Sequence, residues 1–172
     1  LNNGGVMKVA IVMGSDSDLP KLKGCIGLLK DFGIEYKVVV CSAHRTPEAA
    51  AEFSRNAEKE GFGVIIAAAG KAAHLPGVIS AYTPLPVIGV PIKGSALDGL
   101  DALLSIVQMP SGIPVATVAI DGGENAALLA IQILSTADMK LREKMKEYKR
   151  DLAKKVEEKN LNLQEILEKE GL

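Results

Sequence analysis

Both histidines of the chain, His44 and His74, fall in segments that are expected to follow β-strands. Histidine is the side chain whose unperturbed pKa, about 6.5, best suits proton transfer near neutral pH. A single loop histidine is more often a solvated or hydrogen-bonded surface residue. Here neither histidine falls on an expected helix face or within a strand, and both fall where a ligand should bind. We therefore expect one or both of them to serve in proton transfer.

Two segments near these histidines suit an anionic ligand. Residues 14–18 (GSDSD) combine small residues, which let backbone N–H groups approach an anion, with the positive N-terminus of a following helix. Residues 42–47 (SAHRTP) contain Arg45, whose planar set of donors can hold a phosphate. The alternatives are an ordinary connection capped by Asp18, and a surface ion pair at Arg45 beside a cap at Thr46. Two such loops at adjacent strand ends indicate a phosphorylated small molecule more specifically than either alone.

A third segment, residues 70–77 (GKAAHLPG), is small, apolar and bracketed by glycines. A loop of this kind can close over a ligand and exclude water, and its few polar groups suit a small apolar guest or a planar ring. The alternative is a tight, buried connection.

The elements that must position these loops follow a repeating pattern. Apolar runs ended by turn residues predict strands, and helical spacing or a proline start predicts the helices between them. Alternating strands and helices predict an α/β fold of three layers, with a mainly parallel five-stranded sheet of flavodoxin or Rossmann type. Ligands bind beyond the carboxyl ends of such strands, at residues 14–18, 42–46, 70–77 and 89–95. The expected strands are 7–13, 35–41, 64–69, 86–90 and 114–120, and the expected helices are 19–32, 47–60 and 125–137.

Composition and missing motifs exclude several functions. The 172 residues have a net charge of −1, which gives no support to a nucleic-acid partner. There is no Walker A sequence, no GxGxxG after the first strand, and no HExxH, EF-hand or GxSxG motif, so ATP hydrolysis, nicotinamide use and metal catalysis lose support. Cys25 and Cys41 form no CxxC pair and are expected to be buried, reduced thiols. No apolar run suits a membrane helix and no signal peptide is visible, which predicts a cytoplasmic location.

The sequence divides into three expected parts: a flexible leader over residues 1–6, a catalytic domain over 7–137 and a charged helical extension over 138–172. The extension carries ten basic and nine acidic residues. Its apolar positions form a narrow seam, typical of a long amphipathic helix. The seam could fold back on its own domain or pack against a neighbouring subunit. Its members are Leu141, Met145, Tyr148, Leu152 and Val156.

Six motifs resemble the class I PurE family, the N5-carboxyaminoimidazole ribonucleotide mutases of purine biosynthesis. The resemblance covers about residues 7–134. The motifs are GSDSD (14–18), SAHRTP (42–47), AAHLPG (72–77), GVP (89–91), LSIVQMPSGIPVATVAI (104–120) and NAALLA (125–130).

This resemblance implies an isomerase that moves a carboxyl group from an exocyclic nitrogen to a ring carbon of one ribonucleotide, without ATP, metal or another cofactor. It implies that Ser15, Ser42 and Arg45 hold the 5′-phosphate and that Asp18 holds the ribose. It also implies that His44 is the general acid and base, that His74 lies in the site against the substrate or the closing loop, and that the chain forms a homo-octamer. The other residues expected to contact substrate or carbon dioxide are Gly14, Ser17, Ala43, Gly70, Lys71, Ala72, Ala73 and Leu75.

The sequence leaves two points open, the reaction class and the role of residue 71. A class II carboxylase that uses carbon dioxide directly would share these motifs, although His74 in the third loop favours the mutase. A non-catalytic nucleotide-binding module and a purely structural oligomer are less consistent with the histidine-bearing loops. Position 71 is lysine, where the family more often has a small or apolar residue. Lys71 would be strained if the position needs a glycine-like backbone angle, or its ammonium could approach the substrate carboxylate.

Overall fold

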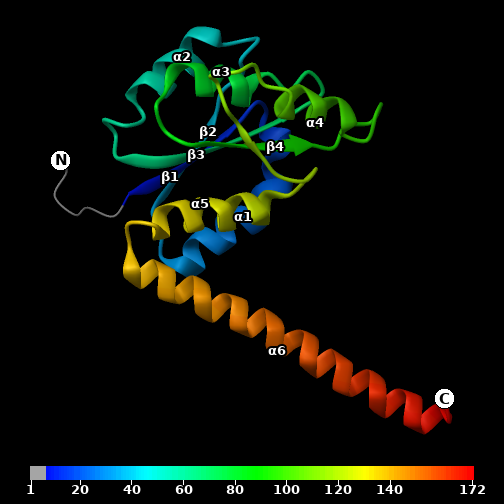
Figure 1. Ribbon diagram of the computed structural model, residues 1–172. Coiled ribbons are helices and arrows are strands. Elements are labelled where there is room, and N and C mark those ends of the chain that lie inside the picture. The colour runs from blue at the N-terminus through cyan, green and yellow to red at the C-terminus, as the bar shows by residue number, and fades with distance from the viewer. Residues whose placement is uncertain (1–6) are drawn as a thin grey trace. The chain divides into compact units, whose positions relative to one another are not determined.

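Five parallel strands form one sheet, in the order β2-β1-β3-β4-β5 (Figure 1). The computed structural model describes residues 7–172, so the expected leader lies outside the described residues. The chain divides between Leu134 and Ser135 into two compact units, and the sheet belongs to the first. This confirms the predicted α/β fold. The strands are β1 (Lys8–Met13), β2 (Tyr36–Val40), β3 (Phe62–Gly70), β4 (Val87–Ile92) and β5 (Ala116–Thr117).

Helices cover both faces of this sheet. Figure 1 shows α2, α3 and α4 on one face and α1 and α5 on the other. The central strands β1, β3 and β4 are buried almost throughout, which explains their continuous apolar sequences. The helices of the first unit are a short 3₁₀ turn η1 (Asp16–Asp18), α1 (Leu19–Phe32), α2 (Pro47–Asn56), α3 (Leu75–Tyr82), α4 (Leu100–Val107) and α5 (Gly123–Ser135).

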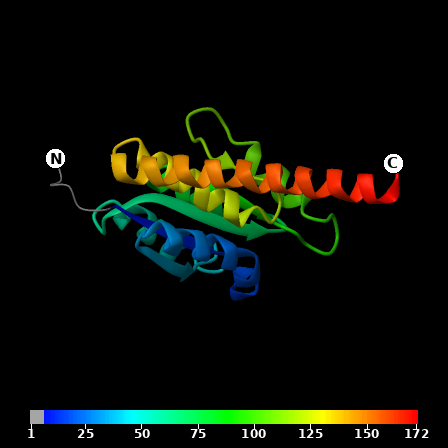
Figure 2. The same cartoon turned by 90° about the horizontal axis from the view of Figure 1, so that it is seen from below.

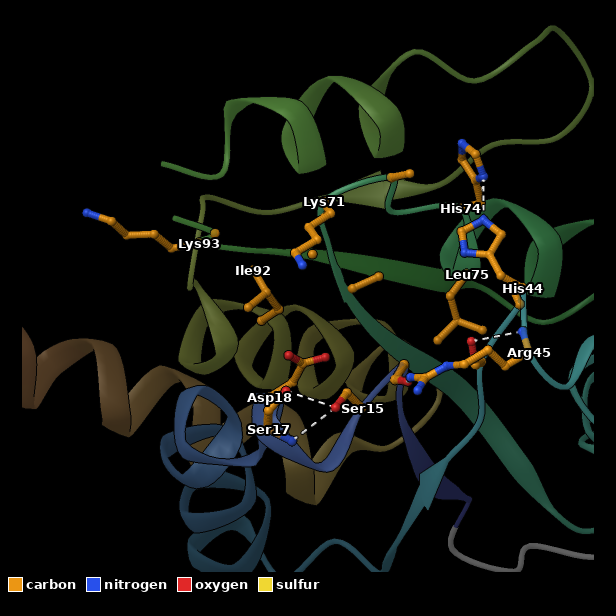
Figure 3. Close-up of a pocket in the computed structure, with 17 residues that line it drawn as sticks. Ser15, Ser17, Asp18, His44, Arg45, Lys71, His74, Leu75, Ile92 and Lys93 are labelled. Atoms are coloured by element: carbon orange, nitrogen blue, oxygen red, sulfur yellow. Dashed lines mark hydrogen bonds between the residues drawn. The ribbon is translucent and has the colours of Figure 1, made fainter. Parts of the chain in front are cut away.

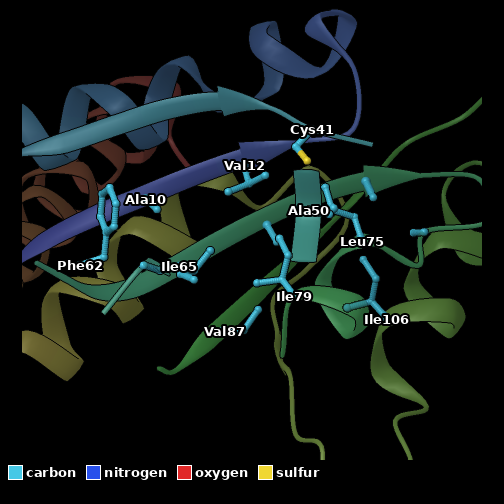
Figure 4. Close-up of a cluster of buried hydrophobic side chains, with 14 of the residues drawn as sticks. Ala10, Val12, Cys41, Ala50, Phe62, Ile65, Leu75, Ile79, Val87 and Ile106 are labelled. Carbon is cyan, nitrogen blue, oxygen red and sulfur yellow. The ribbon is translucent and has the colours of Figure 1, made fainter. Parts of the chain in front are cut away.

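One hydrophobic cluster holds the loops of one face in place (Figure 4). Ile65 of β3, Ile79 of α3 and Ile106 of α4 are fully buried in it. Burying a side chain of this size contributes about 1.5–3 kcal/mol relative to leaving it exposed. The cluster therefore fixes α3 and α4 against the sheet, and with them the segments that follow β3 and β4.

Several local predictions are wrong. Residues 75–77, expected in a loop, begin helix α3, with Pro76 in its first turn. Helix α4 is absent from the elements that the sequence predicts. The fifth strand has two residues instead of 114–120, although Val118 still donates a hydrogen bond to the Gly89 carbonyl at 3.1 Å. The β4–β5 ladder is thus short.

The helix ends of the first unit are capped in different ways. Gly33 ends α1 in the left-handed conformation, with φ 74°. Asp18 and Thr46 make no side-chain cap bonds. Instead, the Thr46 hydroxyl accepts a hydrogen bond from the Ser42 backbone N–H at 3.0 Å, so it stabilises the preceding loop.

The second unit contains the single long helix α6 (Met139–Glu170) (Figure 2). The Asp138 side chain caps it by accepting from the Leu141 N–H, and Gly171 ends it with φ 70°. Leu152 and Val156 of the predicted seam are exposed. Among the described residues 7–172, no helix is both long enough and apolar enough to cross a membrane.

Candidate active site

A cavity of about 640 Å³ lies where the segments that follow β1, β2, β3 and β4 meet (Figure 3). This is the edge where parallel sheets bind ligands. The four segments come from neighbouring strands because the sheet order places β1 between β2 and β3. The cavity is lined by Gly14, Ser15, Ser17, Asp18, Ser42, Ala43, His44, Arg45, Ala69, Gly70, Lys71, Ala72, His74, Leu75, Ile92, Lys93 and Gly94.

Every residue predicted for the site lines this cavity except Ala73. Ala73 is only 1% exposed and packs in the hydrophobic cluster, because the chain turns inward there before α3. Four further residues line the cavity although the sequence analysis does not name them: Ala69, Ile92, Lys93 and Gly94. The sequence does predict residues 89–95 as a strand end, but no single residue among them carries a recognisable chemical signal.

The two histidines are in direct contact. His44 Nε2 and His74 Nδ1 lie 2.8 Å apart, and the ring centroids are 4.9 Å apart at an interplanar angle of 77°. One nitrogen must donate and the other accept, so the bond requires a lone pair on one ring. Two imidazolium rings could not make it. The pair therefore joins the segments after β2 and β3, and the remaining lone pair of two neutral rings lies on the donor ring's other nitrogen, away from this contact.

Hydroxyl groups and Arg45 gather at the β1–β2 side of the cavity. The Ser15 hydroxyl oxygen accepts from the Ser17 hydroxyl at 2.8 Å, and the Ser42 hydroxyl oxygen accepts from the Arg45 backbone N–H at 3.2 Å. The Arg45 guanidinium donates to the Gly14 carbonyl at 3.1 Å, which links the two segments. Several donors thus converge around one cation, an arrangement that suits a phosphate.

Asp18 is a partly buried carboxylate on the floor of the cavity. Burial raises its pKa above the ordinary value, and the charges of Asp121 and Asp16 raise it further, whereas hydrogen bonds from Ser15 and Ser17 lower it. A desolvated carboxylate gains when hydroxyl groups donate to it. The geometry therefore suits a sugar hydroxyl better than an anion at Asp18.

Three residues other than glycine have positive φ angles within residues 7–172, and each lies in a segment that follows a strand. Lys71 (56°) follows β3, Asp98 (51°) lies in the β4–α4 connection, and Asp121 (57°) follows β5. This conformation costs a side-chain-bearing residue about 1–2 kcal/mol. It persists only where surrounding contacts hold it, and such residues concentrate around binding sites.

Asp121 holds the segment after β4 against α1. Its carboxylate pairs with Lys21 Nζ at 2.6 Å and accepts from the Lys93 backbone N–H at 2.9 Å, and its own N–H donates to the Pro91 carbonyl at 2.8 Å. Burial raises its pKa, but the bonds and charges of Lys21 and Lys93 outweigh burial and lower the pKa below its usual value. Asp121 thus supports one wall of the cavity.

We expect Asp121→Asn to lower the free energy of unfolding by about 1 kcal/mol at pH 7, because the ion pair with Lys21 is lost while an acceptor for Lys93 remains. A carboxylate with a lowered folded-state pKa stabilises the protein above its unfolded pKa of about 3.9, and this contribution disappears as the pH falls through the folded value. Urea denaturation at pH 7 and pH 3 measures both effects. Asp98→Asn is the control, since the Asp98 side chain is 78% exposed in its pair with Lys93. A difference from wild type that is no smaller at pH 3 than at pH 7 would contradict this account.

Both cysteines are buried free thiols, as predicted. Burial raises the pKa of Cys25 to about 12. Within the described part of the chain, no group of three or more histidine, cysteine, aspartate or glutamate residues could hold a metal ion.

Known proteins match this chain over most of its length. The family model described as AIR carboxylase matches residues 8–155. The N5-carboxyaminoimidazole ribonucleotide mutase of Pyrococcus horikoshii is 59% identical over 158 residues, which cover 92% of this chain and 89% of that protein. The mutase of Thermotoga maritima is 53% identical over 165 residues, which cover 96% of both chains.

A longer enzyme and a solved structure extend this similarity. The phosphoribosylaminoimidazole carboxylase of Saccharomyces cerevisiae is 56% identical over 140 residues, which cover 81% of this chain but 24% of that protein. The crystal structure of Treponema denticola PurE superposes with a TM-score of 0.81 at 34% identity, covering 90% of this chain and 97% of that one. With this agreement in sequence, fold and strand-end motifs, the chain belongs to the PurE family, also called the AIR carboxylase family.

Proposed function

We propose that this chain converts N5-carboxyaminoimidazole ribonucleotide to 4-carboxy-5-aminoimidazole ribonucleotide, with His44 as the proton-transfer residue. The reaction is the mutase step of purine biosynthesis, an isomerisation. The observation that carries the mutase assignment is the similarity to two mutases over 89% and 96% of their own lengths. The histidine pair in the cavity supports the proposed role of His44.

In this proposal, the protein holds the substrate by its phosphate and its ribose. Ser15, Ser42 and Arg45 bind the 5′-phosphate, and Asp18 accepts hydrogen bonds from the ribose hydroxyls. The convergence of donors around Arg45 and the desolvated carboxylate of Asp18 support these roles. The imidazole ring then extends toward Ala72, Leu75 and the two histidines, all of which line the same cavity.

Protonated His44 gives its proton to the exocyclic nitrogen as the C–N bond of the carbamate breaks and carbon dioxide leaves. The ring carbon then forms a C–C bond to that carbon dioxide, and neutral His44 removes the proton from the same carbon. His44 ends protonated, so the cycle consumes no acid, base, ATP or metal. Carbon dioxide held beside the ring meets its target in a fixed orientation, which replaces a bimolecular encounter.

His74 positions His44 in this scheme through their 2.8 Å hydrogen bond. The bond orients the His44 ring and restricts its tautomer. The apolar residues Ala72, Leu75 and Ile92 line the cavity and favour retention of carbon dioxide over entry of water. Ala73 does not take part in this lining, since it is buried in the core.

The decisive experiment supplies N5-carboxyaminoimidazole ribonucleotide to the purified protein without ATP, metal or bicarbonate, and follows the carbon-carboxylated isomer. Rapid conversion is expected. Carboxylation of aminoimidazole ribonucleotide that requires high carbon dioxide, with no conversion of the carbamate, would instead favour the direct carboxylase. Absence of product in both assays would favour a non-catalytic nucleotide-binding module.

The proposal also covers the oligomeric state of the protein and its location in the cell. Helix α4 exposes Leu100, Leu104 and Val107 at helical spacing, an apolar face that a second copy of the chain would cover. We expect a homo-octamer in the cytoplasm, and light scattering of the purified protein checks the octamer. A monomer at micromolar concentration would contradict it.

A further inference from the structure

Lys71 combines an unfavourable backbone with a place in the cavity wall. It follows Gly70, the last residue of β3, and has a φ of 56°. Lysine has no local side-chain contact that favours this conformation, unlike aspartate or asparagine. A lysine is retained there at a cost to the backbone. An observed outlier of this kind at a binding cavity is grounds for a functional hypothesis about its side chain.

The Lys71 side chain extends into the cavity, between Ile92 and Leu75 and opposite Asp18 (Figure 3). Gly94 leaves room for it, since a methyl group built on Gly94 would lie 4.0 Å from Lys71 Cγ. The charges that raise the pKa of Asp18 are those of Asp121 and Asp16, and within residues 7–172 no ion pair joins Asp18 to Lys71. Lys71 therefore does not serve as the counter-ion of Asp18.

The three cations of the cavity differ in their partners. Arg45 donates to the Gly14 carbonyl, and Lys93 pairs with Asp98 at 3.3 Å. The Lys71 side chain makes no hydrogen bond or ion pair among residues 7–172. It is the cation whose charge is left for a ligand.

The positions of these cations match a ligand with two anionic groups. Arg45 lies with Ser15 and Ser42 on the β1–β2 side, whereas Lys71 extends from the neighbouring end of β3. Substrate and product of the mutase reaction both carry a phosphate and a carboxylate. Once the phosphate occupies the Arg45 side, the carboxylate is the remaining anion that an ammonium group can bind.

We propose that Lys71 binds the migrating carboxylate in both the substrate and the product. This inference rests on the proposed mutase function. The same contact exists before and after the transfer but weakens as the carboxylate becomes carbon dioxide, so it stabilises substrate and product more than the states between them. Its loss should therefore raise KM without lowering kcat. Neutral carbon dioxide gains little from the ammonium, so the contact is weakest between the two steps.

The test compares two ligands that differ only in the carboxylate. Calorimetric titration measures the binding of 4-carboxy-5-aminoimidazole ribonucleotide and of aminoimidazole ribonucleotide to wild type, Lys71→Met and Lys71→Gly. Loss of one charged hydrogen bond should lower the affinity for the carboxylated ligand by about 10- to 100-fold in both variants. The ligand without the carboxylate should bind within about 2-fold of wild type.

Two variants separate the charge from the backbone. Lys71→Gly relieves the positive φ and Lys71→Met does not, whereas both remove the charge, so a loss of affinity that the two variants share reports the charge. Lys30→Met, on the exposed face of α1, is the control for a neutralised lysine outside the site. If both ligands bound the variants more weakly to the same extent, Lys71 would contact the phosphoribosyl part, and the proposal would be overturned. Unchanged affinity for both ligands would also overturn it. Failure of the wild-type protein to bind either ligand would overturn the mutase function itself.

Discussion

Replacement of His44 by asparagine should lower kcat by about 10²- to 10⁴-fold, the usual contribution of a positioned general acid and base. Asparagine keeps a side chain of similar size that can still contact His74, but it cannot donate and recover a proton near neutral pH. The ribonucleotide should still bind, because the phosphate and ribose contacts proposed for Arg45 and Asp18 are untouched. Steady-state turnover and calorimetric titration with the product measure the two effects separately.

The control for His44→Asn is His74→Asn, which removes the hydrogen-bond partner while leaving the proposed proton carrier. We expect a smaller decrease in kcat, about 10-fold, with an altered pH dependence because the orientation and tautomer of His44 are no longer restricted. If His74→Asn were as damaging as His44→Asn, the two histidines would share the proton transfer equally. Near-normal turnover of His44→Asn would remove His44 from the mechanism.

Replacement of Arg45 by methionine should raise KM by about 10²-fold, since charged hydrogen bonds to phosphate are each worth about 1.5–3 kcal/mol. The phosphate lies away from the bonds that change, so kcat should fall by less than KM rises. Part of the effect will come from the lost bond to the Gly14 carbonyl, which joins the segments after β1 and β2. Initial rates over a range of substrate concentrations separate the two constants.

Two variants test the interpretation of Arg45. Arg45→Lys keeps the charge but not the planar set of donors, so its KM should be intermediate. Arg55→Met is the matched control, because the Arg55 guanidinium lies over the Tyr82 ring at 4.5 Å and does not line the cavity. An unchanged KM in Arg45→Met would exclude Arg45 from the phosphate site.

The sequence predicts the sheet and the positions of the loops well, because both depend on local patterns. The apolar run before Gly14 and the spacing of Leu22, Cys25 and Leu29 lead to β1 and to α1, whose predicted bounds match the structure. The strand-end rule then places four segments together, and the cavity lies there. These inferences need only periodicity, turn residues and the handedness of βαβ units.

Other features depend on tertiary contacts and could not be predicted. Ala72 and Ala73 are identical in type and adjacent, yet one lines the cavity and the other is buried in the core. Helix α3 forms because Leu75 and Ile79 pack into that core, although Pro76 and Gly77 suggested a loop. The 2.8 Å contact of the histidines joins residues thirty positions apart, and no local pattern encodes it.

The order of the elements along the chain also bears on how the protein is made. Every residue that lines the cavity lies between positions 14 and 94, whereas α5, which covers the opposite face of the sheet with Ala127 and Ile131, begins at Gly123. At a synthesis rate of about 5–20 residues per second, the binding residues exist for several seconds before α5 is complete at Ser135. During that interval a growing chain carries a full set of ligand contacts above a sheet whose other face still lacks α5. The nascent protein is therefore most prone to aggregate from the face that does no chemistry.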